Sequence, residues 1–172
     1  MTDWPAVHEQ VLAAFQKGWD APGPYAWSFT GPDTEFVQPM LRDGVGAGAW
    51  AEEVTRLVAL IPDVRADVRS WAADRDTMLL EIEFSGTLGG KPFGWRAIDK
   101  LHITADGKLL RREAFFDSAS LAQTVMKRPR AWVRWWRSGI APLDVRRAVL
   151  RKPQPSASSS TDTLPQRQEV TT

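Results

Sequence analysis

The stretch K-P-F-G-W-R-A-I-D-K-L-H-I-T-A-D-G-K-L-L-R-R-E-A-F-F-D, residues 91–117, decides the fold. Two runs of strand-forming residues flank Asp106-Gly107, and an Asp-Gly pair between such runs is the strongest short-range signal for a β-hairpin. Because side chains alternate across a strand, one face of the first run carries Phe93, Trp95, Ala97, Asp99, Leu101 and Ile103. Asp99 is therefore a single carboxylate among large apolar groups, and it is the main candidate for a catalytic residue.

The residues that precede this hairpin predict an α+β fold. We expect, in order, a helix over 4–18 capped by Asp3, an irregular Pro- and Gly-rich segment over 21–33, a short strand over 35–39, a helix over 47–61, and strands over 64–72 and 77–87. The period of the apolar residues changes from that of a helix to two at residue 64. The chain therefore predicts four long antiparallel strands in a curved sheet that wraps onto helices.

The composition excludes several kinds of site. There is no cysteine, which removes disulfides, thiol nucleophiles and cysteine-ligated metals. The two histidines, His8 and His102, do not form a paired-histidine metal motif. We therefore expect neither a metal nor another cofactor. Because the chain has neither an apolar run of ~18 residues nor a signal-peptide pattern, we expect a cytoplasmic protein.

Charge divides the chain into segments. Residues 1–122 contain 12 Lys+Arg and 18 Asp+Glu, whereas residues 123–152 contain 9 and 1. Residues 153–172 are rich in Ser, Thr, Pro and Gln and lack the apolar content needed to fold. We expect an acidic domain over 1–122, a basic helical extension over 123–152 and a disordered tail over 153–172.

The extension contains a strongly amphipathic helix that begins near Pro129 and ends near Gly139. Its apolar side carries Trp132, Trp135 and Trp136, and its basic side carries Arg130, Arg134 and Arg137. Three roles fit this pattern: packing over the mouth of the domain or a dimer seam, peripheral membrane contact through residues 127–140, and nucleic-acid binding. Nucleic-acid binding is the least favoured, because the basic patch is short and the attached domain is acidic.

The predicted elements resemble the nuclear transport factor 2-like superfamily, and within it the SnoaL-like group. The matching motifs are E-F-V-Q-P at 35–39, G-A-G-A-W-A-E-E-V at 46–54 and the final hairpin at 98–117, and together they cover roughly residues 4–120. The resemblance implies a cone-shaped α+β barrel around a pocket beside the first helix, commonly a homodimer through the sheet. The superfamily includes ketosteroid isomerases, epoxide hydrolases, polyketide cyclases, dehydratases and non-catalytic association domains, so function depends on the site.

Most of the catalytic positions that the resemblance implies are not matched. Gln38 stands where isomerases have a general base, and Phe15 falls near the position of their tyrosine. The Arg-x-Asp pattern of epoxide hydrolases falls on residues 81–83, and an acid of epoxide hydrolases and polyketide cyclases falls on Ala114. Only Asp99 matches, at the position of an acid that isomerases keep protonated in an apolar site.

Six residues are candidates for binding a ligand in such a pocket. They are Gln38, Tyr25, Trp27, Trp95 and, as a carboxylate pair on one strand face, Glu81 and Glu83. Each also has a purely structural interpretation. The aromatic residues could fill the core, the two glutamates could lie on a solvated face, and Asp99 could pair with an arginine or with a tryptophan or tyrosine donor.

Two functions remain open from the sequence. In the first, the protein holds a hydrophobic small molecule, and any catalysis is isomerisation, cyclisation or dehydration through Asp99. In the second, it is a non-catalytic binding or association domain that its basic Trp-rich helix attaches to a membrane surface or a partner protein. The unmatched positions Gln38, Phe15 and Ala114 favour the second function, and the buried acid favours the first.

Overall fold

The structure, a computed structural model, describes residues 2–22 and 27–140. Its elements are α1 (Trp4–Asp20), β1 (Thr30–Val37), β2 (Gly44–Val45), α2 (Gly46–Leu60), β3 (Arg65–Asp74), β4 (Thr77–Leu88), β5 (Lys91–Ile103), β6 (Leu109–Phe115), α3 (Ser118–Met126) and α4 (Pro129–Ser138). The predicted α+β class is confirmed. The expected tail, the last part of the extension and Tyr25 lie outside the described residues.

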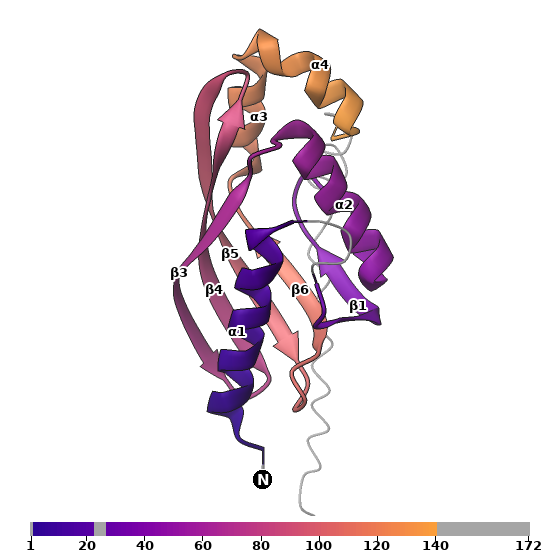
Figure 1. Cartoon of the computed structure of the whole chain (residues 1–172), viewed down its shortest axis with the longest axis vertical. Coiled ribbons are helices and arrows are strands. Elements are labelled where there is room, and N and C mark those ends of the chain that lie inside the picture. Colours follow the sequence, from indigo (N-terminus) through magenta and orange to yellow (C-terminus); the bar gives the residue numbers. More distant parts are fainter. Residues whose placement is uncertain (1, 23–26, 141–172) are drawn as a thin grey trace, which may run out of the picture.

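The strands form one six-stranded sheet in the order β2-β1-β6-β5-β4-β3. β3 to β6 pair antiparallel, as the sequence predicts, but β1 pairs parallel with β6. The sheet is therefore mixed rather than purely antiparallel, and it is not closed into a barrel, because β2 and β3 are edge strands. Figure 1 shows α1 and α2 on the same side of this twisted sheet, with α3 and α4 at one end of the molecule.

β1 begins at Thr30, five residues before the predicted strand. The predicted irregular segment therefore ends earlier than expected, despite its prolines and glycines. Contacts with β6 hold the start of this strand: the Thr34 hydroxyl donates to the Leu109 carbonyl at 2.6 Å, and the Leu109 amide donates to the Phe29 carbonyl at 2.8 Å. Pairing with a distant strand has overridden the local turn signals.

α1 is capped by Asp3, whose carboxylate accepts from the Ala6 amide at 3.4 Å. The helix continues two residues past the predicted end at Gly18. A Cβ atom at that position would lie 3.0 Å from the Trp27 ring, so the glycine permits close packing and does not end the helix.

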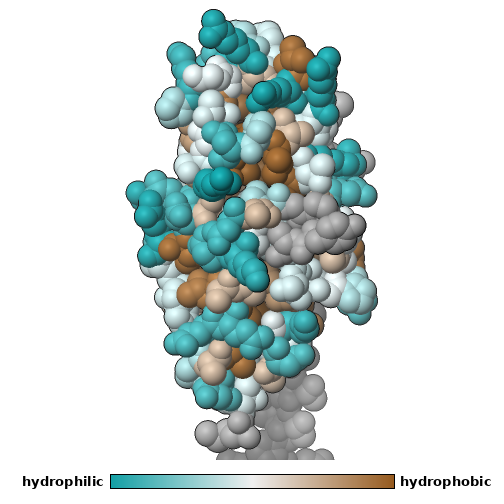
Figure 2. Space-filling view, in the orientation of Figure 1, coloured by the Kyte–Doolittle hydropathy of each residue, from teal (hydrophilic) through white to brown (hydrophobic). Residues whose placement is uncertain are grey.

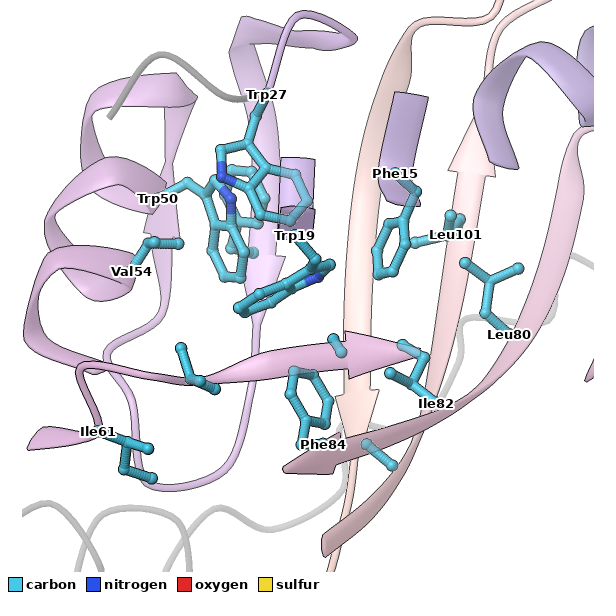
Figure 3. Packing of buried hydrophobic residues seen from close by; sticks show 14 of the residues in the cluster. Phe15, Trp19, Trp27, Trp50, Val54, Ile61, Leu80, Ile82, Phe84 and Leu101 are labelled. Carbon is cyan, nitrogen blue, oxygen red and sulfur yellow. The ribbon is translucent and has the colours of Figure 1, made fainter. Parts of the chain in front are cut away.

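The aromatic core lies between the helices and the sheet (Figure 3). Trp19 packs edge-on against Trp27, Trp50 and Phe84, with ring centroids 5.2, 6.5 and 5.1 Å apart. Such edge-to-face pairs contribute about 0.5–1.5 kcal/mol each beyond the apolar area that they bury. Trp27, a candidate ligand-binding residue, is thus a buried part of this cluster.

The extension packs on the domain. The expected boundary at residue 122 falls inside α3, and α4 contacts α2. At the start of α3, the Asp117 carboxylate accepts from the Ser120 amide at 3.0 Å.

Two neighbouring leucines on β4 test the predicted alternation. Leu80 is 0% exposed and Leu79 is 45% exposed. Leu80→Ala should lower the free energy of unfolding by about 2–5 kcal/mol, because it leaves a cavity in the core. The matched variant Leu79→Ala should lower it by less than about 1 kcal/mol. Urea unfolding followed by circular dichroism measures both, and equal losses would contradict the assigned faces.

Candidate functional site

An apolar cavity of about 70 Å³ lies between the sheet, α2 and the C-terminal helices. Its walls are mainly aromatic and aliphatic, and its polar lining residues are Gln38 and Arg112. This volume holds several water molecules, and it is smaller than the pockets of about 300–1,000 Å³ that enclose drug-sized ligands. The cavity is the best candidate for a binding site in the described part of the chain.

A buried ion pair lies beneath this cavity. Asp99 faces Ala114 across the β5–β6 ladder, and Leu101 faces Arg112, so the acid and the arginine are diagonal neighbours on the inner face. The Arg112 Nε donates to the Asp99 Oδ2 at 2.6 Å. Asp99 is 0% exposed and Arg112 is also buried. The alternation predicts the inward orientation of Asp99, and the structure adds its partner.

Three groups fix the Arg112 guanidinium. Besides the Asp99 contact, Nη1 donates to the Gln38 Oε1 at 3.0 Å, and Cζ lies 4.6 Å from the centroid of the Trp50 ring. Trp50 in turn stacks on Phe36, with centroids 4.9 Å apart. Among the described residues, Nη2 has no hydrogen-bond partner. A planar, oriented cation therefore lines the cavity with one end available to a ligand.

Asp99 is connected to the cavity by its ion pair with Arg112. It is not a lining residue, and its second oxygen, Oδ1, has no hydrogen-bond partner among the described residues. Burial raises the pKa of the Asp99 carboxyl above its ordinary value, and the ion pair with Arg112 opposes that rise. The arrangement suits an acid that orients the guanidinium better than one that contacts a ligand directly.

The structure places only some of the predicted ligand-binding residues at the cavity. Gln38 and Trp95 line the cavity, whereas Trp27 lies behind its wall in the aromatic core. Tyr25 lies outside the described residues.

Glu81 and Glu83 lie on the opposite face of the sheet, away from the cavity. The Glu81 carboxylate accepts from the Ser70 hydroxyl at 2.7 Å, and the Glu83 carboxylate accepts from the Arg69 Nε at 2.7 Å. Both glutamates alternate with the buried residues Leu80, Ile82 and Phe84. Their engagement by neighbours on β3 matches the solvated-face interpretation of this pair.

Arg112 is the site residue that the sequence analysis did not identify. Two consecutive arginines precede Glu113, and only one of them can point inward from a strand. Counting back in twos from the buried Ala114 selects Arg112. An arginine is one of the partners predicted for Asp99, but the choice between Arg111 and Arg112 required the strand register.

The six residues of the extension that are predicted to contact a membrane or a partner differ in their exposure. Trp132 and Trp136 are 45% and 64% exposed, whereas Trp135 is 7% exposed and packs inside. Arg130, Arg134 and Arg137 are exposed. Burial removes Trp135 from any contact surface.

Two further properties concern the described residues alone. They contain no group of three or more His, Cys, Asp or Glu residues that could hold a metal ion. None of the helices over 2–22 and 27–140 has both the length and the apolar composition to cross a membrane.

A comparison with known protein families identifies the family of this chain. Residues 8–112 match the SnoaL-like domain, which is more than half of the sequence. The chain belongs to this family. The match ends at Arg112 and so includes every residue of the guanidinium site. Curated protein sequences provide no match to this SnoaL-like protein.

Solved structures share the fold at low sequence identity. TerC co-crystallised with polyporic acid has a TM-score of 0.63 and 19% identity, covering 70% of this chain and 98% of TerC. A protein from Jannaschia sp. CCS1 that is described as a SnoaL-like polyketide cyclase has a TM-score of 0.62 and 16% identity, covering 72% of this chain and 93% of its own. A Catenulispora acidiphila DSM 44928 protein with a ketosteroid isomerase-like fold, in complex with trimethylamine, has a TM-score of 0.62 and 19% identity, covering 72% and 96%.

Replacing Arg112 with leucine tests the buried pair. The free energy of unfolding at neutral pH should fall by about 3–5 kcal/mol, because Asp99 would remain buried as an unpaired charge. Without the arginine, burial alone acts on Asp99 and raises its pKa further. A raised folded-state pKa stabilises the fold fully below the ordinary value of 3.8, and this stabilisation is lost as the pH rises through the raised value. The defect of the variant should therefore shrink as the pH falls, as measured by urea unfolding.

Two further variants serve as controls. Asp99→Asn/Arg112→Leu has no ionisable group at this site, so its difference from Arg112→Leu isolates the titration of Asp99. Arg111→Leu removes the exposed partner of Glu35 and should cost at most about 1 kcal/mol. Similar losses for Arg111→Leu and Arg112→Leu would contradict the structural role of the buried pair.

Proposed function

We propose that this SnoaL-like protein binds a flat, hydrophobic small molecule with an oxygen acceptor, and that the Arg112 guanidinium receives that oxygen. The observation that carries this proposal is a buried cation, held by Asp99, Gln38 and Trp50, with its free Nη2 at an apolar cavity. The structural relatives with polyporic acid or trimethylamine support a small-molecule site in this fold.

The energetics favour an oxygen-bearing ligand. Hydrogen bonds to charged groups contribute about 1.5–3 kcal/mol, and a ligand oxygen that accepts from Nη2 would gain such a bond. The Trp95 ring lines the cavity and stacks on Phe84 with one face, so its other face supplies a surface on which a planar molecule can stack. A planar ligand with an oxygen acceptor therefore makes more favourable contacts in this cavity than a pure hydrocarbon does.

A ligand of one or two rings requires the cavity to widen. Its lining includes Met40 and Leu41 from the segment after β1, and Leu121 and Val125 from α3. Met40 has a φ of 65°, a left-handed conformation that strains a residue other than glycine. We infer that this segment moves when the cavity fills.

The same geometry suits a cyclase-type or isomerase-type reaction. A preoriented guanidinium stabilises negative charge that develops on a ligand oxygen during isomerisation, cyclisation or dehydration. In this proposal Arg112 contacts the reacting oxygen, and Asp99 acts through Arg112 by keeping it oriented. Asp99 thus contributes to the chemistry as a positioning residue.

A pair of probes of similar shape tests the oxygen preference. In the unmodified protein, 2-naphthol should bind about tenfold or more tightly than 2-methylnaphthalene, because only the naphthol oxygen can accept from Arg112. In Asp99→Asn/Arg112→Met the preference should disappear, while 2-methylnaphthalene still binds. Tryptophan fluorescence reports both, since Trp19, Trp50 and Trp95 line the cavity. Arg111→Met on the outer face is the matched control. Equal affinities for the two probes, or no saturable response to either, refute the proposal.

We also propose that the protein is a homodimer through the outer face of the sheet. Ile98 and Phe115 are exposed there, and they are partners in the β5–β6 register. Leu79 on β4 is a further exposed apolar residue of this face. Apolar surface of this kind commonly marks a protein–protein contact.

Charge at the centre of this face tests the dimer. Ile98→Lys/Phe115→Lys should convert a dimer into a monomer, because like charges would meet across a symmetric interface. Sedimentation equilibrium measures the mass, and Lys91→Glu is a surface control that should leave it unchanged. A monomeric mass for the unmodified protein at all concentrations would reject the dimer.

A second candidate function is attachment to a surface through α4. It is supported by the exposure of Trp132 and Trp136 next to three exposed arginines.

A further inference from the structure

α4 has three distinct faces. One is buried and carries Ala131, Trp135 and Ser138. A second is apolar but exposed, and carries Trp132, Val133 and Trp136. The third is basic and exposed, and carries Arg130, Arg134 and Arg137. At about 100° per residue these sets occupy separate arcs, and the apolar exposed arc lies between the buried and basic ones.

Arg128 fixes the orientation of these faces. Its guanidinium donates to the carbonyls of Leu88, Lys91 and Pro92 at 2.9–3.2 Å and lies 5.5 Å from the Phe93 ring centroid. These contacts join the start of α4 to the β4–β5 turn. The outward faces are therefore held in a defined position at one end of the molecule (Figure 1).

An open cleft of about 530 Å³ adjoins the basic face. Arg130 and Arg134, one helical turn apart, line it together with Gly89-Gly90 of the β4–β5 turn. Both glycines have positive φ, and a Cβ at Gly90 would meet no atom within 4 Å, so that position opens to solvent. Neither arginine has an ion-pair or hydrogen-bond partner among the described residues.

One carboxylate, Asp63, also lines this cleft. Its Oδ1 accepts from the Thr87 amide at 2.8 Å, and hydrogen bonding by the side chain and then the amide of Thr87 lowers the pKa of Asp63. The two guanidinium groups outnumber it, so the cleft keeps a positive charge. α3 and α4 contain no acidic residue that could neutralise it.

We propose that α4 docks this protein on an anionic phospholipid surface, with Trp132, Val133 and Trp136 at the lipid interface and Arg130 and Arg134 holding a phosphate headgroup in the cleft. The proposal rests on the second candidate function and names its partner. Figure 2 shows hydrophobic surface between strongly hydrophilic side chains at the end of the molecule where α4 lies.

The combination of groups favours lipid over other anionic partners. Tryptophan side chains prefer the boundary between headgroups and acyl chains, and arginines beside them reach the phosphates. Nucleic acid would need a longer basic path, and it offers no apolar layer for the exposed side chains of Trp132, Val133 and Trp136. The cavity lies next to this surface, because Leu121, Val125 and Ile140 line it. A docked protein would hold its hydrophobic-ligand site beside the bilayer.

Vesicle co-sedimentation with the full chain tests the docking. The protein should sediment with phosphatidylcholine vesicles that contain phosphatidylglycerol, and not with phosphatidylcholine alone, and added salt should weaken the binding. Arg130→Gln/Arg134→Gln should reduce the partition coefficient about thirtyfold, since each arginine near an anionic surface contributes roughly fivefold. Trp136→Ser should also weaken it.

Matched variants elsewhere on the surface provide the controls. Arg96→Gln/Lys108→Gln removes the same charge from the outer sheet face and the β5–β6 turn, and Trp71→Ser removes another exposed tryptophan; neither should impair sedimentation. No binding to the anionic vesicles, or equal binding by Arg130→Gln/Arg134→Gln, overturns the proposal. So does tighter binding to an oligonucleotide than to vesicles. The arginine variant should still bind 2-naphthol, so a failure of docking is distinguishable from a failure of the cavity site.

Discussion

The ion pair between Asp99 and Arg112 is the constraint on which the rest of the inner face depends. Two charges taken out of water are costly unless they are paired, and because Asp99 Oδ1 has no hydrogen-bond partner among the described residues, the contact with Arg112 is the main compensation for its burial. The pair therefore requires β5 and β6 in one register, Gln38 at the end of β1 and the Trp50 ring from α2. Side chains from four separate parts of the chain meet at one guanidinium. This requirement makes the polar centre of an otherwise apolar core specific to one arrangement.

The aromatic core and the proposed ligand site share their residues. Trp19 and Trp50 pack against other aromatic rings and also line the cavity. The cavity is thus a part of the core that side chains leave unfilled. A change that enlarges the cavity also removes core contacts, so binding and stability are coupled in this protein.

The C-terminal helices connect the cavity with the outer surface. Leu121 and Val125 of α3 line the cavity, and Ile140 after α4 does the same, while Trp132 and Trp136 face outward. Arg128 ties this unit to the β4–β5 turn. The basic extension is therefore part of the wall of the site as well as a candidate contact surface, and the two proposed functions need not exclude each other.

Local periodicity by itself determined the final hairpin, the two N-terminal helices, the antiparallel strands and the inward position of Asp99, because alternation and helical spacing are properties of neighbouring residues. Only the tertiary structure decided the parallel pairing of β1, the choice of Arg112 as the partner of Asp99, and the separation of Trp135 from Trp136. The pairing of β1 and the buried arc of α4 depend on contacts between segments far apart in the chain, and the Asp99–Arg112 pair depends on the register of the β5–β6 hairpin. A strand's register and a helix's buried arc are set by what packs against them, which no local pattern contains.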